Sequence, residues 1–271
     1  MRRLYRMIAV LAAIAAVVVG CYGAYRYMGE KNAGNEYEEI REEAVKEPEE
    51  SEAKAQDEPQ KEQPEEKQEK AQETKESVGI PIDFEELQKR NPDVYAWIQI
   101  PGTSVDYPIV QREEDNAYYL THDINNEENI SGAIFTENYN HKDFEDPNTL
   151  IYGHDMKNGS MFQGLHQYMD RSFFDENRAV TIYLPDRILH YKIFAAYLYD
   201  NRHILMSFDF NDKEVYKRYL EEIFSMRDMN SFVDDSIKVN NENKIITMST
   251  CYAGDSSHRY LVQAVLESVE K

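Results

Sequence analysis

Residues 244–251 read Lys-Ile-Ile-Thr-Met-Ser-Thr-Cys, an apolar and β-branched run that ends on a cysteine. Such a run predicts a β-strand and places Cys251 at its carboxyl end, where a side chain is both rigidly held and exposed. The only other cysteine, Cys21, lies in an apolar segment near the N-terminus, so we expect no internal disulfide. Cys251 is therefore either a small buried apolar residue or a reactive thiol.

A cysteine that attacks a carbonyl group needs a neighbouring base or cation, because the thiolate is the reactive form. His154 follows an apolar strand at residues 149–152 and a glycine, so it also projects from a strand end. Arg259 begins an alternating strand, and its planar fork of donors suits the stabilisation of an oxyanion. Most of the remaining histidines are expected to be incidental; they are His122, His141, His166, His190, His203 and His258.

Periodicity defines the fold class of the C-terminal part. Eight runs of aromatic and β-branched residues predict strands at 95–100, 105–110, 132–136, 149–152, 179–184, 189–199, 244–250 and 259–266. Helical spacing of apolar residues predicts helices at 83–91, 160–169 and 211–228. The domain is therefore mainly β, and eight short strands indicate a barrel or a sandwich.

The N-terminal region predicts a membrane anchor. Residues 7–25 carry no charge and match the ~20 residues that a membrane-spanning helix needs. Preceding arginines predict that residues 1–29 form a cytoplasmic N-terminus and a single-pass anchor, with the rest of the chain on the extracytoplasmic face. A cleaved signal peptide and a lipoprotein processed at Cys21 are the alternatives, and both export the same domain.

Residues 30–78 consist mainly of Glu, Lys, Gln, Ala and Pro, and cannot bury enough apolar surface to offset the entropy of ordering. They predict an acidic disordered stalk, extended or helical in pieces, before a folded domain over residues 79–271. The formal net charge of −21 argues against nucleic-acid binding. The cysteine and histidine spacings fit no zinc motif, and the acidic loop at 123–128 lacks the spacing of an EF-hand, so we expect neither a metal nor a cofactor.

These features together resemble the sortases, and in particular the class B sortases. TMSTC at 247–251 is similar to the sortase signature TLxTC, and Arg259 follows it where sortases have an arginine. NTLIYGHDM at 148–156 is similar to their histidine segment, and the chain order of His, Cys and Arg is also theirs. The class B resemblance is carried by further stretches: RNPDVYAWIQIPGTSVDYPIVQ at 90–111, DNAYYL at 115–120, SGAIF at 131–135 and the helical insertion at 211–228.

The resemblance implies an eight-stranded β-barrel with N-terminal helices and a helix inserted before the cysteine-bearing strand. It implies that Cys251 is the nucleophile, His154 the general acid and base, and Arg259 the group that stabilises the oxyanion. The residues expected to line the substrate groove are Asn116, Leu120, Ser249 and Thr250. The loop around His203 and Ile204 could not be aligned with the family, and Tyr252 stands where some class B members have an acidic residue.

The implied reaction is a transpeptidation. Cys251 attacks the carbonyl of a threonine in a sorting motif near the C-terminus of another exported protein, which gives a thioacyl enzyme. An amine of a peptidoglycan precursor then takes the acyl group. The alternatives are pilus assembly through a pilin lysine, hydrolysis by a cysteine peptidase, and a non-catalytic module that binds near the cell wall.

Overall fold

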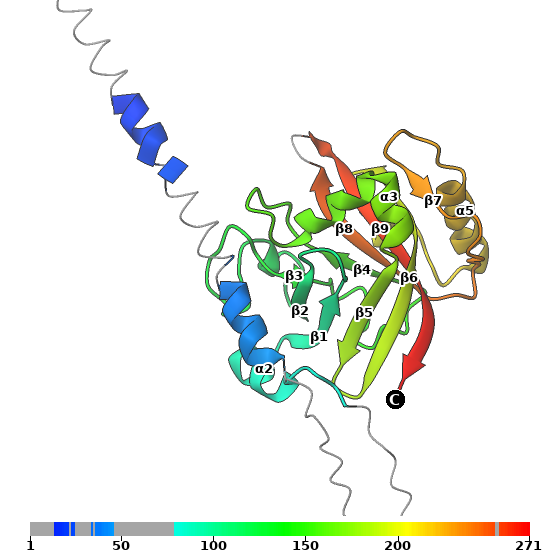
Figure 1. The fold of residues 1–271 in the computed structure, drawn as a ribbon, viewed down its shortest axis with the longest axis horizontal. Coiled ribbons are helices and arrows are strands. Elements are labelled where there is room, and N and C mark those ends of the chain that lie inside the picture. The colour runs from blue at the N-terminus through cyan, green and yellow to red at the C-terminus, as the bar shows by residue number, and fades with distance from the viewer. Residues whose placement is uncertain (1–13, 22, 25–33, 35, 46–78, 253–254) are drawn as a thin grey trace, which may run out of the picture.

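Figure 1 shows the computed structural model, which describes residues 14–21, 23–24, 34, 36–45, 79–252 and 255–271. Residues 14–21 and 23–24 are helical. Within these described ranges, no helix combines the length and the apolarity needed to cross a membrane. Much of the expected anchor and residues 46–78 of the expected stalk lie outside the described ranges.

Residues 36–44 form a helix, which corrects the expectation of a disordered stalk throughout residues 30–78. Tyr37, Ile40 and Ala44 recur on one face of this helix and are 3%, 1% and 2% exposed. This apolar stripe is short and lies among glutamates, so the composition of the segment concealed it.

The helix is attached to the β-domain by polar contacts as well. The Tyr37 hydroxyl donates a hydrogen bond to the carbonyl of Gly132 at 2.9 Å. The Arg41 guanidinium lies 3.2 Å from the carboxylate of Asp106. The folded unit therefore begins before residue 79, with residues 36–45 as part of it.

Eight strands close into a barrel, which confirms the expected fold class. Around the barrel the order is β5-β1-β2-β3-β4-β8-β9-β6, and β5 pairs with β6 to close it. A ninth strand, β7, pairs with β6 outside this ring. The strands are β1 (Val94–Gln99), β2 (Asp106–Val110), β3 (Ile134–Phe135), β4 (Asn148–Tyr152), β5 (Ala179–Leu184), β6 (Arg187–Asp200), β7 (Phe232–Val233), β8 (Ile245–Tyr252) and β9 (Asp255–Glu270).

All eight expected strands are present, and β9 is longer than the expected strand at 259–266. β7 was not expected, because its two residues are too few to show a periodic pattern. Two adjacent pairs in the ring are parallel, β2 with β3 and β4 with β8. The second of these pairs brings two carboxyl strand ends to the same edge.

The helices lie around the barrel, with α5 on one flank and the 36–44 helix on the other (Figure 1). Each of the expected helices at 83–91 and 211–228 contains an observed helix capped by an aspartate, α2 by Asp83 and α5 by Asp212. The expected helix at 160–169 is a 3-10 helix, η2. The elements are α2 (Phe84–Arg90), η1 (Tyr118–Leu120), η2 (Phe162–Met169), α3 (Arg171–Glu176), α4 (Ile204–Ser207) and α5 (Lys213–Phe224).

The strands beneath α5 are buried on both faces. On β6, Ile193 belongs to the larger apolar cluster, whereas its neighbour Phe194 belongs to a second cluster with Tyr219 and Ile223 of α5. Alternate residues of a strand point to opposite faces. Because both faces of this part of β6 are buried, neighbouring positions such as Ile193 and Phe194 are both apolar. The helix inserted before the cysteine-bearing strand therefore covers the barrel beside that strand.

Candidate active site

Three neighbouring strands bring the catalytic candidates to one edge of the barrel. β4 runs parallel to β8, with Tyr152 paired to Ser249, and continuing this register past the strand end places His154 beside Cys251. On the other side of β8, Cys251 is paired with Arg259 of β9. Residues 154, 251 and 259 are far apart in the sequence and are brought together by strand order alone.

Gly153 keeps the two strand ends in close contact. Its backbone N–H donates to the carbonyl of Ser249 at 3.2 Å. A Cβ at this position would lie 2.5 Å from Ile134 Cδ1 and 2.6 Å from Phe162 Cγ, so only glycine fits without moving the core. The backbone that carries His154 is therefore packed directly against its neighbours.

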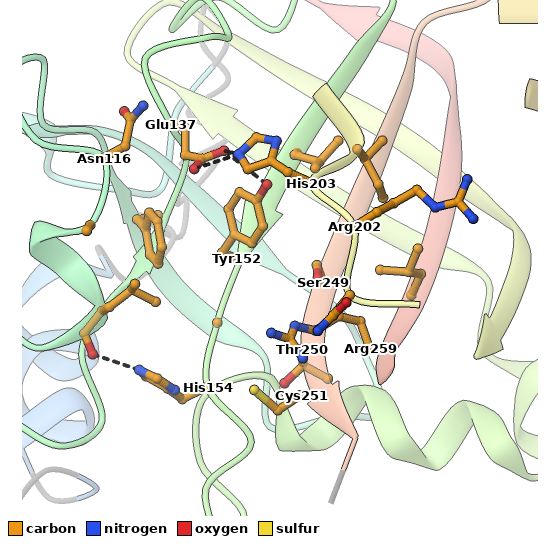
Figure 2. A pocket seen from close by; sticks show the side chains of 18 of the residues that line it. Asn116, Glu137, Tyr152, His154, Arg202, His203, Ser249, Thr250, Cys251 and Arg259 are labelled. Atoms are coloured by element: carbon orange, nitrogen blue, oxygen red, sulfur yellow. Dashed lines mark hydrogen bonds and ion pairs between the residues drawn. The ribbon is translucent and has the colours of Figure 1, made fainter. Parts of the chain in front are cut away.

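The His154 ring is held by the loop that precedes β3. Its Nε2 atom lies 2.7 Å from the carbonyl oxygen of Leu120, and because a carbonyl only accepts, Nε2 carries the proton. Figure 2 shows the His154 ring turned away from the sulfur of Cys251. Proton transfer at Cys251 would therefore involve a change in the direction of this ring.

Gly132 connects this loop to the N-terminal helix. It has a φ of +53°, and a Cβ there would clash with the Tyr119 carbonyl and lie 3.2 Å from His154 Cδ2. Its own carbonyl accepts the hydrogen bond from Tyr37 described above. Gly132 therefore contacts both the 36–44 helix, through Tyr37, and the ring of His154.

Cys251 is exposed, and Arg259 reaches into the same end of the pocket (Figure 2). Nη1 of Arg259 donates to the carbonyl of His258 at 3.0 Å. Ser249 and Thr250 are 6% and 2% exposed. In the described part of the chain, Oγ1 of Thr250 has no hydrogen-bond partner.

A pocket of about 300 Å³ lies over these strand ends and contains all seven residues singled out from the sequence. Asn116 and Leu120 lie on its loop side, where the Asn116 side chain bonds the backbone N–H and the amide of Asn138 at 2.8 and 3.0 Å. Leu120 is 44% exposed. The pocket is lined by Asn116, Ala117, Leu120, Phe135, Glu137, Leu150, Tyr152, Gly153, His154, Asp200, Asn201, Arg202, His203, Ile204, Ser249, Thr250, Cys251, Arg259 and Leu261.

The sequence did not reveal a polar cluster at the other end of the pocket. His203 Nε2 lies 2.8 Å from one carboxylate oxygen of Glu137, and the Tyr152 hydroxyl donates to the same oxygen at 3.0 Å. Burial and then the charge of Glu137 raise the pKa of Tyr152, so its hydroxyl remains a donor. Glu137 follows the expected strand at 132–136 directly, and its position after a strand end could have identified it.

Asp200 and Arg202 add a further ion pair to the pocket wall. Nε of Arg202 donates to the two carboxylate oxygens of Asp200 at 2.8 and 2.9 Å. This hydrogen bonding, together with bonds from the Arg202 backbone, holds the pKa of the Asp200 carboxyl below its usual value. Both groups are therefore charged around neutral pH.

Among the described residues, no group of three or more His, Cys, Asp or Glu side chains could hold a metal ion. In the acidic loop at 123–128, Oδ1 of Asp123 accepts the backbone N–H groups of Asn125 and Glu127 at 2.8 and 3.1 Å. Asp123 therefore shapes a turn in this loop.

Comparison with known proteins gives a consistent result. A family model described as "Sortase domain" matches residues 98–267. Sortase B of Listeria monocytogenes is 35% identical over 169 residues, which are 62% of this chain and 67% of that protein. The X-ray structure of Clostridium perfringens sortase B matches with a TM-score of 0.61 at 32% identity, over 69% of this chain and 100% of that one.

The crystal structure of sortase B from B. anthracis in complex with AAEK1 extends the match to 91% of this chain and 99% of that chain, with a TM-score of 0.66 and 27% identity. The barrel, the family match and these relatives all agree. The chain belongs to the sortase family and is a class B sortase, a cysteine transpeptidase.

Proposed function

We propose that this transpeptidase uses Cys251, His154 and Arg259 to cut a sorting motif after threonine and to join the exported protein to an amine of a peptidoglycan precursor. The observation that carries this assignment is the strand register, which places residues 154, 251 and 259 next to one another at one edge of the barrel. Strand register fixes their backbones relative to one another, as catalysis by oriented groups needs.

In the first step the thiolate sulfur of Cys251 attacks the threonine carbonyl carbon, and the carbonyl electron pair moves to oxygen. The exposure of Cys251 supports access of a peptide, and the register pairing with Arg259 supports a cationic donor beside the developing oxyanion. Arginine suits this position because its fork of N–H groups can reach both the oxyanion and the peptide backbone.

His154 acts as the proton carrier. As an imidazolium it protonates the leaving amine while the carbon–nitrogen bond breaks and the thioester forms. It then accepts a proton from the incoming amine, whose nitrogen attacks the thioester and releases Cys251. The hydrogen bond to Leu120 describes the state without a peptide, and catalytic hydrogen bonds often form only in the substrate complex.

The peptide lies in the pocket between Cys251 and the loop side. We assign its binding to Asn116, Leu120, Ser249 and Thr250, all of which line the pocket. A solved relative is described as a Staphylococcus aureus sortase B–substrate complex. A pocket of about 300 Å³ accommodates a few side chains, which suits a short motif.

We also propose that the enzyme is held at the membrane by residues 1–29, with residues 46–78 as a spacer and the barrel outside the cytoplasm. Members of the sortase family are extracellular or membrane-associated. Cell fractionation tests the anchor: the enzyme should remain with membranes in wild type and in Cys21→Ala. Release of the Cys21→Ala protein alone would indicate lipoprotein processing instead.

The reaction is tested by incubating the protein with a panel of sorting-motif peptides and an amine, and by reading product masses. We expect the N-terminal peptide fragment to end in threonine joined to the amine, and Cys251→Ala to form no product. If the product remains the free acid when amine is added, and no amide forms, the enzyme would be a hydrolytic peptidase. A product formed only with a pilin-type lysine would support pilus assembly.

A further inference from the structure

A second histidine touches the backbone of the candidate nucleophile. His166 lies in the last turn of η2, which packs against β8 and β9. Its Nε2 atom is 3.1 Å from the carbonyl oxygen of Cys251. A carbonyl oxygen can only accept, so Nε2 is the donor in this contact.

The His166 ring is fixed from several sides. Its Nδ1 atom lies 3.5 Å from Oδ1 of Asp155, and both side chains are 13% exposed. The ring also makes edge contacts with Tyr260 and Tyr252, with centroids 5.5 and 6.4 Å away. A ring held in this way loses little further freedom when it donates to a backbone carbonyl.

The contact occurs where the sheet is irregular. The register between β8 and β9 shifts between Cys251 and Tyr252, so the regular ladder is interrupted at the residue that carries the thiol. At this point a side chain from another element supplies a donor to the strand. The carbonyl carbon and the Cβ of Cys251 are bonded to the same Cα. The orientation of the carbonyl group therefore influences the direction in which the sulfur points.

We propose that His166 is a positioning residue for the nucleophile, and that Asp155 orients its ring. Asp155 directly follows His154 in the chain, so the pair connects the segment that carries the proton carrier to the peptide of Cys251. This inference rests on the proposed assignment of Cys251 as nucleophile.

His166 acts through the backbone of Cys251 and is distinct from His154. Its Nε2 is engaged by the Cys251 carbonyl, whereas His154 lies at the end of β4 and contacts Leu120. Removing the His166 donor should therefore change how the thiol is presented more than how tightly the peptide binds. A misplacement of about 1 Å at a reacting group can lower a rate on the order of 10²-fold.

The test compares His166→Phe, which fills the space without a donor, with His166→Gln, whose amide can still donate. The full-length protein is treated with a thiol-alkylating reagent, and modification of the peptide that contains Cys251 is followed by mass. We expect His166→Phe to lower both the alkylation rate and kcat on the order of 10- to 100-fold with little change in KM. His166→Gln should retain most of both rates.

His190→Phe is the matched control, because this ring also pairs with a carboxylate, Glu270 at 3.3 Å, but lies partly exposed on β6 and does not line the pocket. Its rates should equal those of wild type. The inference is overturned if His166→Phe keeps wild-type rates, or if His166→Gln loses as much as His166→Phe while both melt at the wild-type temperature.

The outcome for Cys251→Ala separates this inference from the proposed function. Transpeptidation that persists in Cys251→Ala would remove the nucleophile assignment itself. An inactive Cys251→Ala together with a fully active His166→Phe would remove only the positioning role of His166.

Discussion

The two sides of the pocket are built differently. One side consists of strand ends: Ser249, Thr250 and Cys251 on β8, Arg259 on β9 and His154 directly after β4. The other side consists of loops and the ends of short elements, which supply Asn116, Leu120, Glu137 and residues 200–204. Strand register fixes backbones closely, whereas loops tolerate change. We propose on this basis that the strand side carries the catalytic groups, and that the loop side contributes most to the choice of peptide.

Arg259→Lys tests the strand side and should have a larger effect than any single substitution on the loop side. Lysine keeps the charge but lacks the fork of donors, so turnover should fall on the order of 10²-fold, as for the loss of an oxyanion donor. Steady-state kinetics should show this fall in kcat. Arg171→Lys, at an exposed ion pair with Asp175, is the control and should be unaffected. Near-normal turnover in Arg259→Lys would reduce Arg259 to a structural residue.

Variants of His203 test the loop side. His203 caps α4 by accepting the Met206 N–H at 3.3 Å and also binds Glu137, so it holds the loop at the pocket. His203→Ala loses both contacts and should raise KM about 5-fold for a loss of about 1 kcal/mol, with kcat little changed. His203→Asn can still cap the helix but is too short to reach Glu137.

Comparing the two His203 variants separates the cap from the ion pair. If the pair with Glu137 is what matters, His203→Asn should resemble His203→Ala. His141→Ala removes an exposed histidine that pairs with Asp146 at 2.8 Å and should leave KM unchanged. A fall in kcat without a change in KM would contradict the division between the two sides.

Tyr37→Phe tests whether the N-terminal helix supports the backbone that packs against His154. Removing the hydroxyl leaves the carbonyl of Gly132 without this buried donor, so the free energy of unfolding should fall by about 1 kcal/mol. Because Gly132 lies against His154, a modest fall in kcat should accompany it. The control is Tyr183→Phe, which removes a hydroxyl bonded to Gln99 at 3.3 Å. This change should leave kcat unchanged even if it lowers stability, because Tyr183 does not line the pocket. Unchanged unfolding in Tyr37→Phe would show that the helix docks without this bond.

The smallest predicted effect concerns pH and the same helix. Burial first, and then the charges of Asp123 and Glu127, raise the pKa of Glu36 from its usual 4.5 to about 7. The folded state holds this proton more tightly than the unfolded state does. Protonated Glu36 therefore contributes its full stabilisation of the folded state below about pH 4.5, and this contribution is lost as the pH rises through about 7.

Glu36→Gln mimics the protonated carboxyl and should remove this part of the pH dependence. Melting temperatures measured at about pH 5 and about pH 8 should differ less in Glu36→Gln than in wild type. Glu39→Gln, at an exposed position of the same helix, should keep the wild-type difference. Equal behaviour of the two variants would show that Glu36 does not govern the docking of the helix.

The comparison of the two sides also explains how far the sequence could predict the site. The alternation of apolar residues located all eight barrel strands, and so it located the strand ends at Cys251 and His154. The pairing of Cys251 with Arg259 follows from two strands joined by a short connection. The spacing of apolar residues in the sequence is therefore sufficient to locate a strand or helix that buries one face in the core.

What the sequence could not predict depends on contacts between distant residues. The contact between Glu137 and His203 joins two loops, and nothing near either residue indicates the other. His166 resembles the other histidines until η2 is folded against β8. The 36–44 helix was hidden because only three of its residues are buried against the domain.

The central claim is that Cys251, at the end of β8, carries the acyl group between the two halves of the reaction. The most direct measurement is the intact mass of the protein after brief mixing with a sorting-motif peptide and no amine. We predict an adduct equal to the peptide fragment ending in threonine, located on the peptide that contains Cys251 and discharged when amine is added. An adduct on another residue, or amide product formed by Cys251→Ala, would contradict the account.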